Sequence, residues 1–232
     1  MSWVDDLINS PLLIDATAIA LIIIVVVMLY GNRKNRRRMK EIWAVLAETI
    51  KTYGEKVGHT GGYRHLKISV STDDRNWKLE KVEFMVILEN RDNAFHYIFK
   101  LFRPQYDKLL IQGSFGSKSQ RRLKKSELEV VSLEDKTTRK RAARRLSSLP
   151  PYSLKAIPDE KFTVRTNSEK LMEHSIKSLS SELIELLVRI SIGQDDPHVF
   201  TLWRIEKPDM IKNMADFVFS FCNTLVENAH LA

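Results

Sequence analysis

The stretch Leu12–Tyr30 constrains this chain more than any other. It contains 19 residues, of which only Asp15 is charged. At about 1.5 Å per residue a helix of this length reaches about 28 Å, close to the ~30 Å hydrocarbon core of a bilayer. The part Ile22–Leu29 has no polar face, so a helix here must be buried on all sides, in lipid or in protein. No other part of the sequence could cover it, so we expect a transmembrane helix at 12–30 after a short leader at 1–11.

The charges flanking this span predict its orientation. Only Asp5 and Asp6 precede it, whereas six basic residues follow it directly: Arg33, Lys34, Arg36, Arg37, Arg38 and Lys40. The positive-inside rule places the N-terminus outside or in a lumen, and everything after Gly31 in the cytosol. We expect the six basic residues to lie at the membrane surface against anionic lipids. Without a basic region before the apolar run, a cleaved signal peptide is disfavoured. The expected protein is a single-pass integral protein of the endoplasmic reticulum or a prokaryotic plasma membrane.

The residues after the span predict one α+β cytosolic domain, an antiparallel sheet with covering helices, tethered by the transmembrane helix. The segment 31–53 combines the basic run with an apolar stripe of helical spacing, and four glycines at 54, 58, 61 and 62 predict a loop after it. Alternating patterns predict strands at 64–71, 79–88 and 108–115. A wide apolar face predicts a helix from Asn90 or Asp92 to the stop at Pro104.

The second half of the chain continues the same pattern. We expect a strand at 127–133, a helix at 135–146, a short strand at 162–164 and a helix from Ser168 to about Leu179. Strands are predicted at 183–192 and 199–205, joined by a turn at 193–197, and a final helix follows Pro208. The break near Ser147–Pro151 divides a first α+β part (54–149), with a basic arm at 118–145, from a second part (150–232).

Motifs that carry enzymatic or metal chemistry do not emerge from the sequence. His59 and His65 lie six residues apart in a glycine-rich segment, where solvated histidines are far commoner than metal ligands. The glycines around them lack the Lys-Ser/Thr of a phosphate-binding loop. The single cysteine, Cys222, lies in an apolar stretch and predicts a buried thiol. We therefore expect no enzyme activity, no cofactor and no metal site.

Basic residues in two clusters give the strongest functional signal after the span. The net charge is +8, and most of it lies in the run after the span and in the stretch 118–145. The first cluster holds Lys118, Arg121, Arg122, Lys124 and Lys125, and the second Arg139, Lys140, Arg141, Arg144 and Arg145. Side chains this densely charged repel one another and stay extended, which suits a phosphate-rich partner. Anionic lipid headgroups and structured RNA both fit. The clusters hold no aromatic residue, which argues against stacking on single strands.

The order of these features resembles the calumin family, the large subunit of the PAT intramembrane chaperone complex beside the Sec translocon. The likeness runs through the span, the Gly31-Asn32-Arg33-Lys34-Asn35 stop and the helix that holds Trp43. It is most specific from Val86 to Ile111, where a strand leads to Arg91-Asp92, an apolar helix ends at Arg103-Pro104, and Asp107 precedes the next strand. The segments Leu149-Pro150, Ser153-Leu154 and Pro208-Asp209-Met210 fit more loosely.

This resemblance implies a place for the domain at the junction of ribosome and translocon. The implied partners are the Sec translocon, the ribosome through its ribosomal RNA, and a small multi-helix membrane subunit of the Asterix type. The chain departs from the family in lacking its long acidic luminal segment and its long charged C-terminal helix. We expect a membrane-protein biogenesis factor, a translocon-associated chaperone subunit. The alternative is a membrane-anchored interaction scaffold whose basic segments bind anionic lipid headgroups.

Overall fold

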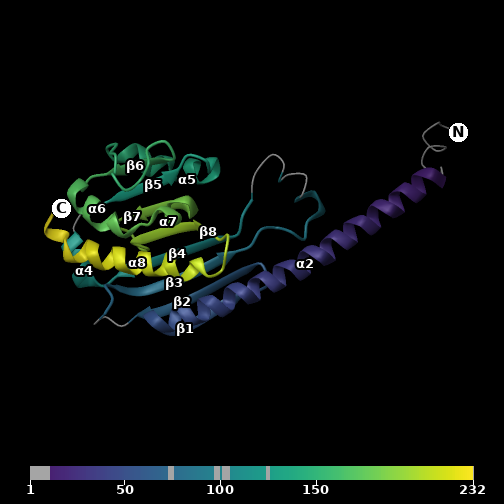
Figure 1. Cartoon of the computed structure of the whole chain (residues 1–232), viewed down its shortest axis with the longest axis horizontal. Coiled ribbons are helices and arrows are strands. Elements are labelled where there is room, and N and C mark those ends of the chain that lie inside the picture. The colour runs from purple at the N-terminus through teal and green to yellow at the C-terminus, as the bar shows by residue number, and fades with distance from the viewer. Residues whose placement is uncertain (1–10, 73–75, 97–99, 101–104, 124–125, 232) are drawn as a thin grey trace.

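The computed structural model describes residues 11–72, 76–96, 100, 105–123 and 126–231 (Figure 1). Its longest element is helix α2 (Pro11–Tyr53), 43 residues without a break. The N-terminal half of α2 projects away from the folded domain, and apolar side chains such as Ile19 (58% exposed) and Leu29 (67%) face outward there. Its C-terminal half packs on the domain through Ile42 and Leu46, which are fully buried. The span and the helix after it, expected as neighbours, thus form one continuous helix.

The domain is built on one eight-stranded sheet in which all neighbouring strands are antiparallel. The strands are β1 (Gly54–Gly61), β2 (His65–Thr72), β3 (Leu79–Ile87), β4 (Lys108–Phe115), β5 (Leu128–Ser132), β6 (Phe162–Thr166), β7 (Leu187–Ile192) and β8 (Val199–Arg204). Their order in space is β1-β2-β3-β4-β8-β7-β5-β6. The predicted α+β class and antiparallel sheet are confirmed. The two parts expected on either side of residue 149 share this sheet, because β4 pairs with β8 and β5 lies between β7 and β6.

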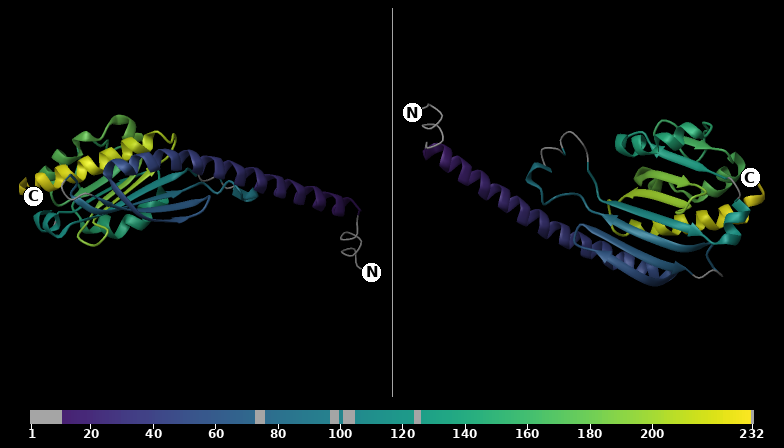
Figure 2. Two further views of the ribbon diagram at one scale, coloured as in Figure 1. Left: turned by 90° about the horizontal axis from the view of Figure 1, so that it is seen from below. Right: turned by 180° about the vertical axis from the view of Figure 1, so that it is seen from behind.

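One face of the sheet carries the hydrophobic core. The C-terminal half of α2 and helix α8 (Met210–Glu227) lie side by side on this face (Figure 2). The shorter helices α6 (Glu169–Ser175) and α7 (Ser181–Leu186) contribute buried leucines to the same core. The ring of Tyr53, at the end of α2, stacks on Phe219 of α8 with centroids 3.9 Å apart. Cys222 of α8 is fully buried in this core, and burial raises the pKa of its thiol.

The other face is only partly covered. Helix α5 (Lys136–Ser148) contacts β5, and its inward side chains Thr138 and Ala142 are buried. Helix α4 (Ser117–Leu123) follows directly after β4 and instead contacts α8, on the core side of the sheet. Both basic clusters thus lie largely on helices, and the helix predicted at 135–146 is confirmed as α5. Asp135 caps α5 by accepting a hydrogen bond from the N–H of Thr138 (2.9 Å), and the buried side of α5 holds it on the sheet.

The glycine-rich segment after α2 was expected as a loop but forms the edge strand β1. A Cβ at Gly54 would lie 2.1 Å from the carbonyl oxygen of Ser71, and one at Gly61 would lie 2.1 Å from that of His65. Gly61 also has a φ of 134°, a conformation that glycine adopts at no steric cost. The glycines at the two ends of the strand therefore permit close backbone approach to β2. An edge strand exposed on both faces shows no apolar alternation, so its sequence resembles a loop.

Two further expectations are changed by the structure. The apolar run 183–192, expected as one strand, begins as helix α7 and becomes β7 at Leu187. The hydroxyl of Ser180 caps α7 by accepting from the N–H of Leu183 at 3.3 Å. A serine at this position indicates the start of a helix, but the mainly apolar sequence that follows resembles a strand. The helix expected up to Pro104 is seen at Ala94–His96, and its stop at Pro104 lies outside the described residues.

Candidate functional site: the junction of α2 with the sheet and the basic helices

Helix α2 meets the folded domain through three positions that share one face of the helix: Gly31, Asn35 and Arg38. An added Cβ at Gly31 would lie 1.9 Å from the carbonyl oxygen of Arg91, so the two backbones are in direct contact. Asn35 is fully buried one turn further on. Its Nδ2 donates to the carbonyl oxygen of Glu89 (3.2 Å), and its Oδ1 accepts from Nη1 of Arg91 (2.9 Å). The segment after β3 is thus held against α2 by backbone contact and by hydrogen bonds.

The carboxylate of Asp107, 3% exposed, joins α2 to two strands. Its Oδ2 lies 3.2 Å from Nε of Arg38, and its Oδ1 lies 2.9 Å from Nη1 of Arg91. Oδ1 also accepts the backbone N–H of Glu89 at 2.9 Å. The guanidinium of Arg38 donates further to the carbonyl oxygens of Ile205 (3.3 Å) and Glu206 (2.6 Å), directly after β8.

Glu89 completes the arrangement as a second buried carboxylate, 6% exposed. It lies 3.1 Å from Nη2 of Arg91, 2.8 Å from Nε2 of His96 and 2.7 Å from Nζ of Lys100. We call six residues the clamp: Gly31, Asn35, Arg38, Glu89, Arg91 and Asp107. Each of its buried charges has an opposite partner, which is the condition under which buried charges are tolerated.

The clamp lies at one end of the sheet. It lies where β3 ends and where β4 begins, and we call this the clamp end. The opposite end, where β4 finishes at Phe115 and β7 finishes at Ile192, is the far end. The eight residues of β4 correspond to about 27 Å at ~3.4 Å per residue.

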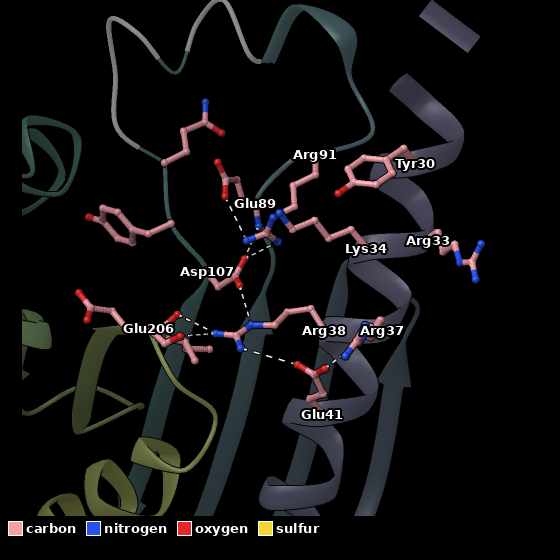
Figure 3. Close-up of a pocket in the computed structure, with 13 residues that line it drawn as sticks. Tyr30, Arg33, Lys34, Arg37, Arg38, Glu41, Glu89, Arg91, Asp107 and Glu206 are labelled. Carbon is pink, nitrogen blue, oxygen red and sulfur yellow. Dashed lines mark hydrogen bonds and ion pairs between the residues drawn. The ribbon is translucent and has the colours of Figure 1, made fainter. Parts of the chain in front are cut away.

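A groove of about 600 Å³ lies beside the clamp, between α2 and the segments that flank β4 and β8 (Figure 3). Tyr30 and Lys34 project from α2 toward Arg91, whereas Arg33 projects away from it. Arg37 pairs with Glu41 at 3.2 Å on the α2 wall. No ion pair of Lys34 is seen within the described ranges, whereas the Arg91 guanidinium in the same groove is paired with Glu89 and Asp107.

Tyr106 forms part of the opposite wall of the groove. Its hydroxyl donates to Oδ2 of Asp135 at 2.7 Å, and its ring contacts two cations, Nζ of Lys108 at 4.9 Å and the guanidinium of Arg204 at 4.7 Å. Burial, and then the Asp135 carboxylate, raise the pKa of Tyr106 to about 12. Burial alone would raise the pKa of Asp135, but hydrogen bonds from Thr138 and Tyr106 and the charge of Lys108 outweigh it and lower the pKa.

Five of the six basic residues after the predicted span are exposed on α2: Arg33, Lys34, Arg36, Arg37 and Lys40. Arg38, expected at a membrane surface with them, instead turns inward, and its side chain is 19% exposed in its ion pair with Asp107. The run is therefore divided between a solvent-facing set and one residue that holds the domain to the helix.

The first basic cluster lies at the far end of the sheet, on α4. Lys118, Arg121 and Arg122 are exposed there. Lys124 and Lys125, predicted to act with them, lie outside the described residues. In the described ranges the three α4 cations make no ion pair, so their charge is available to a partner.

The second basic cluster runs along α5, from near the clamp end toward the far end. Arg139, Lys140, Arg141 and Arg144 are exposed. Arg145 turns inward instead: it donates to Oγ of Ser191 (2.7 Å) and to the carbonyl oxygen of Ile192 (2.8 Å). A Cβ at Gly193 would lie 2.3 Å from its Nη2, so that glycine makes room for the guanidinium. Arg145 thus has a structural partner set and is the least available member of the predicted cluster.

The turn between β7 and β8 touches both basic helices. Gln120 of α4 donates to the carbonyl oxygen of Gln194 (3.3 Å), and Arg145 of α5 reaches Ile192 at the start of the same turn. The sequence predicted this turn and both clusters but not their approach at the far end. The acidic residues Asp195 and Asp196 are exposed in the turn and separate the two groups of cations.

Sequence reasoning missed the clamp as a unit. Glu89 was not singled out, and Asn35 and Asp107 were noted only within the family resemblance. One feature of the sequence indicates the clamp. Gly31 and Asn35 interrupt the basic run and lie on the same helix face as the buried apolar residues Met39 and Ile42.

By length and composition α2 is the one described helix able to cross a membrane, with a mean hydropathy of 2.0 in an apolar window of which 6% is buried. Across the described residues, no group of three or more His, Cys, Asp or Glu side chains is placed to hold a metal ion. The sequence matches no protein-family model, and a search of curated proteins returns no match.

Proposed function

We propose that this chain is a single-pass membrane protein whose domain faces the cytosol and whose basic helices bind a polyanion there, in the manner of a membrane-protein biogenesis factor docked at the ribosome. The observation that carries the proposal is the position of α4, which is separated from the clamp by the length of β4, about 27 Å. Its three exposed cations make no ion pair with any described residue.

The membrane part of the proposal rests on the exposed half of α2. A core helix of a soluble protein buries its apolar side chains, whereas Ile22 (63%), Val26 (57%) and Leu29 (67%) are exposed on α2. A removable signal sequence is disfavoured because the same unbroken helix continues into the clamp and the core. The exposed cations at Arg33, Arg36 and Lys40 follow the apolar half directly, which supports a cytosolic side for the domain.

A soluble polyanion is favoured over the membrane surface as the partner of α4 because α4 lies far from the membrane-spanning half of α2. Electrostatic attraction between exposed charges is largely screened beyond about 8 Å at physiological ionic strength. The cations on α4 lie several times farther than this from the point where α2 leaves its apolar half. Structured RNA, recognised through its phosphates, suits a cluster without aromatic residues. The ribosome is the RNA implied by the calumin resemblance, which also implies the Sec translocon and an Asterix-type subunit as partners.

A second candidate function is a scaffold whose α5 cluster lies on anionic lipid. It is favoured by the start of α5, where Asp135 accepts from Tyr106 near the clamp end. Arg139, Lys140 and Arg141 are therefore closer to the predicted bilayer than α4 is. The two functions differ in what they require of α4.

Ribosome pelleting of the full-length protein in mild detergent tests the proposal. Reversal of the α4 charges (Lys118→Glu, Arg121→Glu, Arg122→Glu) should weaken binding and reduce the slope of log affinity against log salt by about 2–3, since each lost phosphate contact contributes ~0.7–0.9. Reversal on α5 (Arg139→Glu, Lys140→Glu, Arg141→Glu) should have a similar effect.

A matched control reverses three exposed lysines elsewhere on the domain, Lys155, Lys170 and Lys177. If this control loses as much binding as the α4 variant, the effect is one of net charge and the proposed site is rejected. Unchanged ribosome binding by the α4 variant rejects the RNA role. Loss of binding to phosphatidylglycerol vesicles by the α5 variant alone, with ribosome binding unchanged in both variants, favours the scaffold.

A further inference from the structure

The groove beside the clamp has the features of a site for a single anionic headgroup. It is concave, at about 600 Å³, and its lining holds five basic and four acidic residues, a formal charge of 5 − 4 = +1. Lys34 from α2 and Arg91 from the segment after β3 lie close together in it (Figure 3). Arg91 is engaged on one side by Glu89 and Asp107, which hold its guanidinium in place. Lys34 is exposed, and the described residues offer it no ion pair. The positive charge of Lys34 is therefore the one that an anion in the groove would neutralise, and Arg91 would add hydrogen-bond donors beside it.

The position of the groove along α2 identifies the kind of anion. Tyr30, the last residue of the apolar run, lies at the upper edge of the groove and is 63% exposed. Above it the surface of α2 is apolar and exposed at Leu29 and Val26. Below it Gly31 and Asn35 are buried in the clamp. An amphipathic ring at such a boundary is typical of the headgroup layer of a bilayer.

We propose that this groove binds the phosphate of one anionic phospholipid, with Lys34 and Arg91 as the charged contacts and Tyr30 beside the glycerol region. The acyl chains of that lipid lie along the exposed apolar surface of α2 directly above the groove. The apolar surface of α2 adjoins the groove, so a phospholipid could contact both. A free phosphate ion would contact only the groove, which favours the lipid. The proposal rests on the membrane-spanning part of the proposed function and not on RNA binding.

The site is more specific than the general attraction between a basic run and a charged membrane. Arg33 and Arg36, which carry the same charge, lie outside this pair: the side chain of Arg33 projects away from Arg91, and Arg36 donates to Asn32 and covers the ring of Tyr63. A diffuse attraction would depend on all cations of the run alike. A built site depends on Lys34 far more than on other lysines of α2.

Native mass spectrometry of the delipidated full-length protein in neutral detergent provides the test, with dioleoyl-phosphatidylglycerol and dioleoyl-phosphatidylcholine as probes. We expect one phosphatidylglycerol to be retained in preference to phosphatidylcholine. Lys34→Ala should weaken its retention about tenfold or more, since a charge-assisted hydrogen bond is lost. Lys34→Arg should keep most of it.

The control is Lys51→Ala, an exposed lysine in the last turn of α2. Equal retention of the two lipids, or equal losses with Lys34→Ala and Lys51→Ala, overturns the site. Displacement of phosphatidylglycerol by millimolar inorganic phosphate overturns the lipid as occupant and identifies a free-anion site. The assay needs neither ribosomes nor the residues of α4 and α5, so its outcome is independent of the polyanion test.

Discussion

The carbonyl oxygen of Arg91 lies 1.9 Å from the point where Gly31 would carry a Cβ. This contact sets how closely the apolar helix approaches the domain, because a backbone oxygen cannot rotate away as the end of a flexible side chain can. The hydrogen bonds of Asn35 and the ion pair of Arg38 with Asp107 follow on the same helix face. The other clamp contacts therefore form only if residue 31 is a glycine, which lets α2 approach this closely.

Gly31→Ala should destabilise the domain despite the better helix propensity of alanine. Alanine gains about 1 kcal/mol of propensity, but relief of the overlap with Arg91 must move α2 and lengthen the clamp contacts. Overpacking of this kind costs about 1–3 kcal/mol. Urea unfolding of the full-length protein in detergent, followed by tryptophan fluorescence, should show a net loss. Gly58→Ala is the control, since nothing lies within 4 Å of its added Cβ. A Gly31→Ala protein as stable as the wild type would show that the close approach is not required.

Asp107→Asn should be among the most destabilising single changes in the domain. The variant leaves Arg38 and Arg91 without their shared carboxylate, and loss of one partner of a buried pair costs about 3–5 kcal/mol. The same unfolding experiment measures it. Glu48→Gln removes an exposed carboxylate from α2 and should stay within about 0.5 kcal/mol of the wild type. A loss below 1 kcal/mol for Asp107→Asn would mean that solvent compensates the two guanidinium groups and that the clamp does not hold α2.

Tyr106 should make stability depend on pH in the alkaline range. Its pKa is raised from 10.0 to about 12 in the folded protein. A folded-state pKa above the unfolded value means that the stabilisation is complete below pH 10 and is lost as pH rises through 12. Unfolding at pH 9 and pH 12 should therefore differ more for the wild type than for Tyr106→Phe. Absorbance titration at 295 nm should assign a phenol ionising near pH 12 to Tyr106. If the phenol missing from the variant ionises near pH 10, the hydrogen bond to Asp135 is not formed in solution.

The sheet and the C-terminal half of α2 were predicted from the spacing of apolar residues in the sequence. The strands β2, β3 and β4 alternate between a buried and a half-exposed face, so their pattern is visible in any short window. The edge strand β1 has no such pattern, since neither of its faces is buried, and its glycines serve backbone contact with β2. Helix α7 buries Leu183 and Leu186 and exposes Glu182 and Glu185, but it has only six residues and runs directly into β7. Periodicity over so short a segment does not separate a helix from a strand.

The clamp and the groove could not be predicted in the same way because their partners are distant in the chain. Arg38 and Asp107 are 69 residues apart, and Arg38 and Glu206 are 168 apart. Many carboxylates in the sequence could neutralise Arg38, and only the sheet order selects one of them. Composition likewise predicted the two basic clusters but not that Arg145 would turn inward to Ser191. Charge counts describe what a segment carries, and the topology decides which charges face solvent.

The place of β8 between β4 and β7 has a consequence for the timing of folding during synthesis. Strands β1 to β4 pair in chain order and can associate as they emerge. The other edge of β4 stays unpaired until β8 is made, and the core face with Leu109 and Ile111 stays uncovered until α8 follows. A nascent chain that pauses before Val199 therefore exposes a flat strand edge beside an apolar surface, which is the condition for aggregation. The domain therefore cannot complete its folding during synthesis until its last strand, β8, and its last long helix, α8, have been made. Until then strands β1 to β4 lack their final packing partners.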